Sequence, residues 1–545
     1  MNPKSSATAR LTAGEGRLPF ILRVGVTGHR RLDHPDDLRP AIHEAVRGLG
    51  ARLLGAKAPL PPVLVLSALA EGADRLAARE LLTGPGAMLE AVLPLPPEDY
   101  LNDFGSAESR ADFFALLGRS AATWQVPPST TREEAYERAG RRIVDRSDVV
   151  VALWDGRPAR GRGGTATVVS YAEDRGVPLA WIRTAGDPGP EYRLDDVRAR
   201  GMREAAYEFR QYNAMRVGDF PRRVSTERDR LRPEPGGRST AFAQAHEVVA
   251  DWIVPYFVRA DTLASRLHRQ FRLMSAAIFL MAAAAVVVVA TQVTFLPRHD
   301  WIAAVEVVLL ALLLVLPVLN HRRQVLDRWI SYRFLAERLR SEYFFALCGT
   351  RSHRVRPSSG SQFFDPSEAW VRRAVMEVVA VRPAVRTAPS DVHLLKQYLC
   401  RHWIRSQIDY HRRAARRQGA WETRLYLVTS IIFGITLIAA VLHMLGTGQD
   451  ADRDSAWGLL LIVLSIGMPT LGAALHGIRT QAQFRQHCQR YRRMAQLLAD
   501  LETTLQEART LERIREVAIE TERVMREETS AWFGVMRFHD IELIS

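Results

Sequence analysis

Cysteine and lysine are scarce in this sequence of 545 residues, which has three of each. The cysteines are Cys348, Cys400 and Cys488, and none stands in a CxxC pair or at a Cys/His metal-ligand spacing. These absences exclude a disulfide framework and a zinc site, and we expect no metal ion and no obligatory cofactor. Residues 1–18 lack the apolar core of a signal peptide and are expected to form a disordered N-terminus.

Charged residues are nearly absent from four apolar runs, at residues 273–295, 301–319, 425–445 and 457–475. Each run is close to the ~17–25 residues that a helix needs to cross the hydrocarbon core of a bilayer. The runs form two pairs with short connections, so the sequence predicts four transmembrane helices arranged as two hairpins with long helical extensions.

Matching motifs flank the two hairpins. Tyr-x-x-Arg-Ala precedes each hairpin, at Tyr256 and Tyr410, and Tyr-Arg-x-x-Ala-x-x-Leu follows each, at Tyr332 and Tyr491. Two motifs recurring in the same order indicate an internal duplication. The tyrosine, alanine and leucine of the second motif share one helical face, which predicts that the extensions pack against each other.

Arginine supplies nearly all of the positive charge behind the formal net charge of +14. The arginines gather at the span ends away from the short connections, which by the positive-inside rule places both termini and residues 351–400 in the cytoplasm. The charge is interpreted first as membrane topology and second as contact with anionic lipid, so no specific nucleic-acid binding is expected. We expect a multi-pass membrane protein.

Residues 19–184 alternate apolar runs with amphipathic stretches, which is typical of an α/β, Rossmann-like domain with a parallel sheet. We refer to this part as the head. Strands are expected at 21–27, 63–67, 88–93, 149–154 and 179–183, and helices at about 36–54, 69–82, 132–146 and 165–175. Residues 185–240 are expected to be a linker, flexible over 222–238, with one short ordered element at 207–212.

Polar or glycine-bearing turns follow three of the predicted strands, where α/β sheets bind ligands close to helix N-termini. Glycines let backbone amides approach a phosphate, Thr165 is expected to cap the next helix, and Arg30 or Arg162 to contact phosphate oxygens. The candidate ligand-binding residues are Gly28, His29, Arg30, Ser67, Glu71, Gly72, Asp74, Asp155, Gly156, Gly163, Gly164 and Thr165.

With these turns in this order, the head resembles the SLOG superfamily, a Rossmann-like group that includes DprA-type DNA-processing proteins and LOG-type nucleotide phosphoribohydrolases. The residues that carry the resemblance are 25–30, 67–74, 95–100, 148–156 and 163–165, so it covers nearly the whole head. The resemblance implies that the head binds a nucleotide or a nucleotide-derived ligand over Gly28, Gly72, Gly163 and Gly164.

One position departs from the hydrolytic branch of that superfamily, whose motif resembles Gly-Gly-x-Gly-Thr-x-x-Glu. Val168 stands where that motif has its glutamate, and a valine cannot act as a general base. The sequence therefore favours a sensor over an enzyme, and it leaves Glu71, Asp74 and Asp155 as the candidate carboxylates if catalysis occurs.

Residues 240–350 and 390–535 resemble the SLATT family, two-span membrane domains fused to or encoded beside SLOG sensors and nucleotide-signal synthases in bacteria. The resemblance rests on the repeated motifs and on Trp403-x-x-x-Gln407-x-x-Tyr410. It implies a membrane-perturbing, pore-forming effector of anti-phage or similar conflict systems, located in the bacterial inner (cytoplasmic) membrane. The two membrane units are expected at 241–350 and 401–545, with a cytoplasmic connection at 351–400.

Few polar groups interrupt the predicted spans. Glu306 is expected near the outer interface, either at a pore mouth or among the headgroups, and Pro317 and Pro469 are expected to kink the second and fourth spans. Four apolar helices of one chain are expected to close into a bundle without an aqueous lumen, so a conducting pore requires a homo-oligomer.

Three functions are compatible with these features. The first is an effector in the lipid bilayer that is gated by a nucleotide-like ligand bound to the head. The second is a membrane-tethered hydrolase that cleaves a nucleotide or its N-glycosidic bond. The third is a membrane scaffold that does not conduct. The residue at position 168 favours the first function over the second.

Overall fold

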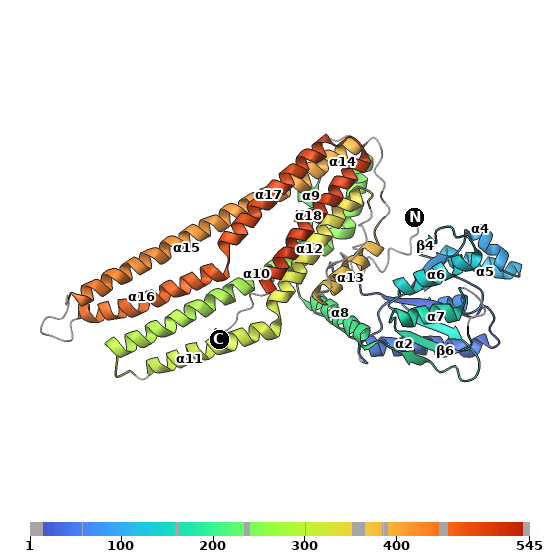
Figure 1. Cartoon of the computed structure of the whole chain (residues 1–545), viewed down its shortest axis with the longest axis horizontal. Helices are drawn as coiled ribbons and strands as arrows, with labels where there is room; N and C mark the ends of the chain where they lie inside the picture. The colour runs from blue at the N-terminus through green and yellow to red at the C-terminus, as the bar shows by residue number, and fades with distance from the viewer. Residues whose placement is uncertain are drawn as a thin grey trace. The chain divides into compact units, whose positions relative to one another are not determined.

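The computed structural model describes residues 15–56, 58–158, 163–233, 240–299, 301–350, 366–383, 385, 391–445 and 456–537. The chain forms two compact units, Met1–Arg216 with Phe363–Val381 and Val217–Gln362 with Arg382–Ser545. An α/β domain with a mostly parallel sheet is followed by an all-helical region with four long apolar helices (Figure 1). The predicted fold class is confirmed.

The first unit is built on a seven-stranded sheet with the order β4-β3-β2-β1-β5-β6-β7. The strands are β1 (Leu22–Gly28), β2 (Val63–Ser67), β3 (Met88–Leu93), β4 (Ala122–Gln125), β5 (Val149–Trp154), β6 (Leu179–Arg183) and β7 (Glu191–Arg193). Only the β6–β7 pair is antiparallel. All five predicted strands are present, and the two that were not predicted, β4 and β7, are short and largely exposed edge strands.

Helices cover both faces of this sheet. Helices α2 (Pro35–Leu54) and α3 (Ala73–Leu81) bury apolar side chains on one face, and α6 (Arg132–Arg146) and α7 (Thr165–Asp174) bury theirs on the other. Short helices α4 (Pro97–Tyr100) and η1 (Leu101–Asp103) and the longer α5 (Ala107–Arg119) connect β3 to β4. The alternation of strand and helix therefore produces the layered fold that the hydrophobic pattern predicted.

Two helices occupy the region in which a linker was expected. Helix α8 (Asp196–Ala214) contains the predicted element at 207–212 and buries Phe209 and Tyr212. Helix α9 (Phe220–Leu231) spans residues 222–231, so the expectation of a flexible segment was wrong there. Only Phe220 and Val224 of α9 are buried, which leaves too sparse an apolar pattern for the sequence to reveal the helix.

Helix α13 (Pro366–Ala380) belongs to the first unit although it lies, in sequence, between the two membrane hairpins. It packs against α8 and is held by a network of buried ions. Arg373 donates to both carboxylate oxygens of Asp148, at 2.9 and 2.7 Å, and Arg23 donates to both oxygens of Glu377, at 2.7 and 3.0 Å. Burial raises the pKa of Asp148, but Arg373 and Arg23 outweigh that effect and leave it below its ordinary value.

The second unit is entirely helical within the described residues. Its members are α9, α10 (Thr240–Phe295), α11 (Trp301–Arg323), α12 (Val325–Leu347), α14 (Val392–Tyr398), the π-helical segment η3 (Leu399–Arg405), α15 (Ser406–Met444), α16 (Ala456–Gln481), α17 (Phe484–Glu507) and α18 (Leu511–Arg537). All four predicted spans coincide, to within one residue, with parts of helices that are long and apolar enough to cross a membrane, namely α10, α11, α15 and α16.

The four apolar helices pack as a row in the order α15, α16, α10, α11. Glycines of α16 permit the close approach, since a Cβ at Gly467 would lie 3.2 Å from Val287 of α10 and one at Gly472 would lie 3.2 Å from Phe433 of α15. The expectation of a closed four-helix bundle was wrong. Only 11–22% of the most apolar window of each helix is buried, so most apolar side chains face outward.

Outside the spans, the helical extensions pack as the motifs predicted. Tyr332, Ala336 and Leu339 of α12 are fully buried, and α17 buries Ala495 and Leu498 at the matching positions. Both extensions begin after a left-handed glutamine, Gln324 with φ 48° and Gln483 with φ 45°; Tyr332 and Tyr491 each follow eight residues later. Helix α18 packs on α12 and α17 through Ile514, Val517 and Ala518.

Candidate functional site

The candidate ligand site of the head lies where the strand order reverses. From β1 the chain builds β2, β3 and β4 on one side and then returns to place β5 on the other. The turns after β1 and β5 therefore diverge at the carboxyl edge of the sheet, which is where open α/β sheets bind ligands. Predicted residues from both turns lie at this edge, because Gly28 pairs with Leu153.

His29 and Asp155 connect the two turns. The backbone amide of Asp155 donates to Nε2 of His29 at 3.1 Å, and Oδ1 of Asp155 lies 3.0 Å from the same nitrogen. Gly28 is required for close packing here, since a Cβ would lie 2.4 Å from the Cβ of Ala73 and 2.7 Å from the carbonyl oxygen of Leu153. Both His29 and Asp155 are partly exposed, so they can contact a solute.

The turn after β2 is internally bonded and strained. Asp74 is buried and accepts hydrogen bonds from the Ser67 hydroxyl and the Ala68 amide, each at 3.2 Å. Burial raises the pKa of Asp74 to about 6, although those donors oppose the shift. Leu69 has φ 57°, a conformation that is uncommon for a bulky residue and that concentrates at functional sites.

The other two predicted residues of this turn also have contacts within the head. Gly72 has φ 77°, and a Cβ there would lie 2.4 Å from the carbonyl oxygen of Arg30, so the turn after β2 packs directly on the turn after β1. Glu71 accepts a hydrogen bond from the Ser109 hydroxyl of α5. Each candidate catalytic carboxylate of the head therefore has a partner that explains its position.

A polar cluster beside these turns was missed by sequence reasoning. Asp103, at the end of η1, lies 3.3 Å from Arg30 and also contacts Arg132 and the hydroxyl of Tyr136 on α6. The guanidinium of Arg30 lies 5.2 Å from the Tyr136 ring. The only sequence signal was that Asp103 closely follows the Leu-Pro-Pro-Glu-Asp-Tyr element after β3.

The predicted glycine turn before α7 joins the same cluster. Gly163 has φ 81°, and a Cβ there would lie 2.9 Å from the Cβ of Tyr136. Gly164 occupies the N-cap of α7 and Thr165 is its first residue, so the expected capping by Thr165 was wrong. The N-terminus of α7 thereby faces the edge of the sheet that also carries Arg30. Arg162 lies outside the described residues.

Val168 lies one turn into α7 and packs in the core. It is 6% exposed, and its Cγ2 approaches α6 so closely that a Cβ at Gly140 would lie 2.5 Å away. Gly156, the remaining predicted residue, is exposed with φ 80° in the turn after β5. The structure thus brings the turn residues together while the side chain at position 168 points into apolar surroundings.

The predicted polar and proline positions of the spans lie in α11 and α16. Glu306 is partly exposed in α11, Pro317 is buried in the same helix, and Pro469 is partly buried in α16. Both helices continue past their prolines. Within the ranges that the structure describes, no three His, Cys, Asp or Glu side chains gather where they could hold a metal ion.

The fold thus defines an α/β domain joined to a helical unit that has two candidate membrane hairpins. Residues 399–532 match the family described as SMODS and SLOG-associating 2TM effector domain 1, SLATT_1. This stretch begins at η3 and contains α15, α16, α17 and most of α18, so the chain has a SLATT_1 two-transmembrane effector domain, as its second hairpin predicted. No curated protein matches the chain.

Proposed function

We propose that this protein is a membrane effector controlled by a nucleotide or nucleotide-derived ligand that binds the head. The observation that carries the proposal is the effector-domain match over the second hairpin, in the same chain as a domain with a Rossmann-type strand order. The ligand would lie over the turns after β1, β2 and β5, with its anionic group at the N-terminus of α7 and near Arg30. We further propose that the head is a member of the SLOG superfamily.

A sensing role has more support than hydrolysis. Asp74 is buried with its oxygen bonded to Ser67, Glu71 is bonded to Ser109, and Asp155 accepts from the Arg157 amide at 3.0 Å. Val168 adds no carboxylate and has no room to be replaced by one without repacking α6. These contacts favour ligand binding over general-base chemistry.

The path of the chain supports control of the helical unit by the head. The chain leaves the helical unit after α12, enters the head to form α13, and returns to form α14. A ligand-induced change in the head would therefore act on both hairpins through covalent connections as well as through any contact. We propose that α13 is the element that transmits the signal.

The membrane portion is proposed to be a duplicated SLATT-type unit. Support comes from the repeated motifs and from the left-handed glutamines at the start of α12 and α17, each eight residues before the motif tyrosine. Because the spans form a row with outward apolar faces, we propose that several chains assemble around a pore. Glu306 would lie near its mouth.

We propose that the protein resides in the bacterial inner membrane with both termini in the cytoplasm and acts in an anti-phage or similar conflict system. The arginine-rich span ends support this topology. A fluorescent protein fused to the C-terminus should fluoresce. Alkaline phosphatase inserted at residue 450 should be active, because this topology places that loop in the periplasm.

Leakage from liposomes tests the central proposal. Purified protein in dye-filled liposomes is expected to release dye when a panel of nucleotides is applied, and Gly164→Asp should abolish the response. Gly164 has φ −74° at an N-cap, where aspartate is favoured, so the variant keeps α7 and only places a negative charge against the ligand. Gly118→Asp is the matched control, because Gly118 is exposed with open space around it.

Each alternative has its own outcome. Release of free base or ribose phosphate that is lost in Asp155→Ala would establish the hydrolase instead. Ligand binding without leakage at any protein density would favour a scaffold. Equal ligand-dependent leakage in the Gly164→Asp and Gly118→Asp variants would show that the ligand does not bind at the proposed site on the head.

A further inference from the structure

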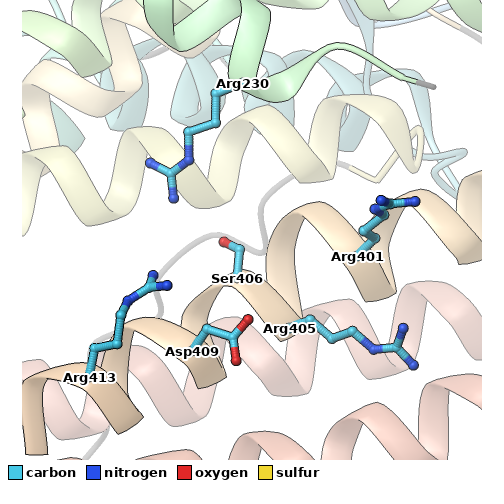
Figure 2. Close-up of a pocket in the computed structure, with 6 residues that line it drawn as sticks. All are labelled: Arg230, Arg401, Arg405, Ser406, Asp409 and Arg413. Atoms are coloured by element: carbon cyan, nitrogen blue, oxygen red, sulfur yellow. The ribbon is translucent and has the colours of Figure 1, made fainter. Parts of the chain in front are cut away.

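A cavity of about 550 Å³ lies in the second unit, among helices that the proposed ligand site does not include. Its lining residues are Arg230 of α9, Arg401 and Arg405 of η3, and Ser406, Asp409 and Arg413 of α15. Figure 2 shows Arg230 reaching into the cavity from one side and Ser406 and Arg413 from the other, whereas Arg405 extends away. Four guanidinium groups with one carboxylate favour an anionic occupant.

The carboxylate partners of Arg230 and Arg405 limit how much positive charge the cavity offers. Arg230 lies 3.6 Å from Glu227, and Arg405 contacts Glu502 of α17. Arg413 has no carboxylate within 4.0 Å in the part of the chain that the structure describes. Burial raises the pKa of Glu227, against the opposing effects of Arg230 and Arg340. The carboxylate that lines the cavity itself is Asp409.

A smaller chamber of about 240 Å³ opens from the same place and shares Arg230, Arg401 and Ser406 with the outer cavity. Its walls include the aromatic rings of Phe257 of α10 and Tyr343 and Phe344 of α12. Charged and polar side chains, among them Glu227 and Arg340, also line it. An outer space lined by arginine and an inner space with aromatic walls therefore adjoin.

Hydrogen bonds hold the walls of the inner chamber in place. The hydroxyls of Tyr343 and Tyr398 lie 2.6 Å apart, and Tyr398 donates to the carbonyl oxygen of Leu231 at 2.6 Å. Phe344 stacks on Trp403 with ring centroids 4.7 Å apart. These contacts tie α9, α12, α14 and η3 together around the chamber, so the site is formed before any ligand enters.

We propose that the two spaces form a second ligand site, which binds a molecule with a phosphate-like group in the outer cavity and a planar aromatic ring in the inner chamber. Nucleotides have this combination of groups. Arginine binds phosphate through paired N–H donors, and aromatic walls accept a flat ring by stacking. The combined space falls within the ~300–1,000 Å³ typical of small-molecule sites.

The site is distinct from the one proposed on the head, because all its lining residues belong to the second unit. Arg413 precedes the predicted span at residue 425 by twelve residues, or about 18 Å of helix at ~1.5 Å per residue. Arg401 and Arg405 lie further from the span. The cavity thus lies too far from the bilayer for a lipid headgroup to reach it. We therefore propose that the occupant is a soluble molecule.

Binding here would connect the extensions of the two hairpins. The first hairpin contributes Phe257 and Tyr343, the second contributes Arg401 and Arg413, and α9 contributes Arg230. A bound ligand would stabilise the arrangement in which these helices adjoin, and thus bias the hairpins toward it.

Equilibrium binding of a ribose-labelled fluorescent ATP analogue to the full-length protein in detergent tests this site. Gly164→Asp removes the head site, and that variant is expected to bind one probe per chain. Adding Arg401→Ala and Arg413→Ala should weaken binding by about tenfold or more, since two charge-assisted contacts are lost. The matched control adds Arg412→Ala and Arg416→Ala, two exposed arginines of α15 that do not line the cavity, and should change affinity by less than about twofold.

The stoichiometry separates the two sites. If the head does not bind nucleotide, wild type and Gly164→Asp both bind one probe, and the proposal for the cavity stands. If Gly164→Asp binds none, or if the cavity and control variants weaken binding equally, the proposal for the cavity is overturned.

Competition tests the two halves of the ligand. Adenosine diphosphate should displace the probe at a concentration at least about tenfold lower than inorganic pyrophosphate does, because only the former fills the inner chamber. Equal potency would overturn the role of the chamber. Displacement by phosphatidylglycerol vesicles at the same phosphate concentration would instead assign the cavity to lipid.

Discussion

Replacing Arg373 by methionine is expected to weaken the docking of α13 on the head while both units stay folded. Arg373 makes two hydrogen bonds to Asp148 and a third to the carbonyl oxygen of Ile21 at 2.8 Å. Without it, Asp148 would be a buried carboxylate lacking its main partner, and removing one member of a buried ion pair costs roughly 3–5 kcal/mol. Undocking of α13 would reduce this free-energy cost, since it exposes Asp148 to water.

Trp370, Val371 and Val378 of α13 are buried and keep their contacts in the variant, so the lost ion pair alone sets how far the undocking equilibrium shifts. The helix has 15 residues, and an isolated helix of that length is only marginally stable in water. A cost of about 3 kcal/mol shifts the undocking equilibrium by roughly 100-fold. The amides of α13 should therefore exchange with solvent at least about 100-fold faster in Arg373→Met than in wild type.

Hydrogen exchange of the full-length protein in lipid nanodiscs measures this shift. Peptides covering residues 366–380 should lose protection, whereas β2 and α17 should keep theirs. Met376→Ala is the control, because Met376 lies on the same helix and is 51% exposed. Unchanged exchange in α13 would refute the reasoning, and loss of protection throughout the head would show that the ion pairs stabilise the whole domain instead.

The same variant tests how the head controls the hairpins. If α13 transmits the signal, Arg373→Met should bind the head ligand with wild-type affinity but should no longer leak dye in response to it. A normal ligand-dependent leak in a protein whose α13 exchanges freely would assign transmission to another connection.

Three further predictions address the head, the repeat and the extensions. Val168→Glu should destabilise the head by about 3 kcal/mol or more in thermal unfolding, because it buries an unpaired carboxylate against Gly140, and it should not create hydrolysis; a stable, hydrolytic variant would contradict the sensor. Gln324→Gly should raise stability by about 1 kcal/mol, since glycine adopts φ 48° without strain; a lower Tm would show that the side chain contributes more. Burial lowers the pKa of His411 to about 4, so below pH 6.5 the unfolded chain binds more protons than the folded one. The free energy of unfolding should therefore fall by about 2 kcal/mol between pH 7 and pH 5. Urea unfolding of wild type and of His411→Gln measures this pH dependence, and equal pH dependence in the two proteins would contradict the prediction.

Strands and spans were predictable because each leaves a continuous apolar run in the sequence. β2 and β5 are apolar because they are buried along nearly their whole length. The spans are mostly unburied within the structure, and they are apolar over the length that a bilayer requires. β4 was not predictable, because an edge strand whose residues are mostly exposed has no such run.

Long-range pairing decided what the sequence could not. Asp103 belongs to the polar cluster only because the fold places η1 beside Arg30 and α6, which are distant from it in sequence. Arg373 and Glu377 look like an ordinary pair on a helix surface, and nothing local indicates that their partners are Asp148 and Arg23. Ion pairs between distant segments have no sequence period, so no periodic pattern reveals them.

By itself, the amino-acid sequence determined which segments are the five buried strands, which helices are apolar enough for a bilayer, and which turns carry glycine and charge, since each depends on neighbours within a few residues. The tertiary structure decided that α13 belongs to the head, that the spans form an open row, and that arginines of α9, η3 and α15 surround one cavity. Those outcomes depend on which distant surfaces complement each other, and complementarity is a property of packed surfaces rather than of any short stretch of chain.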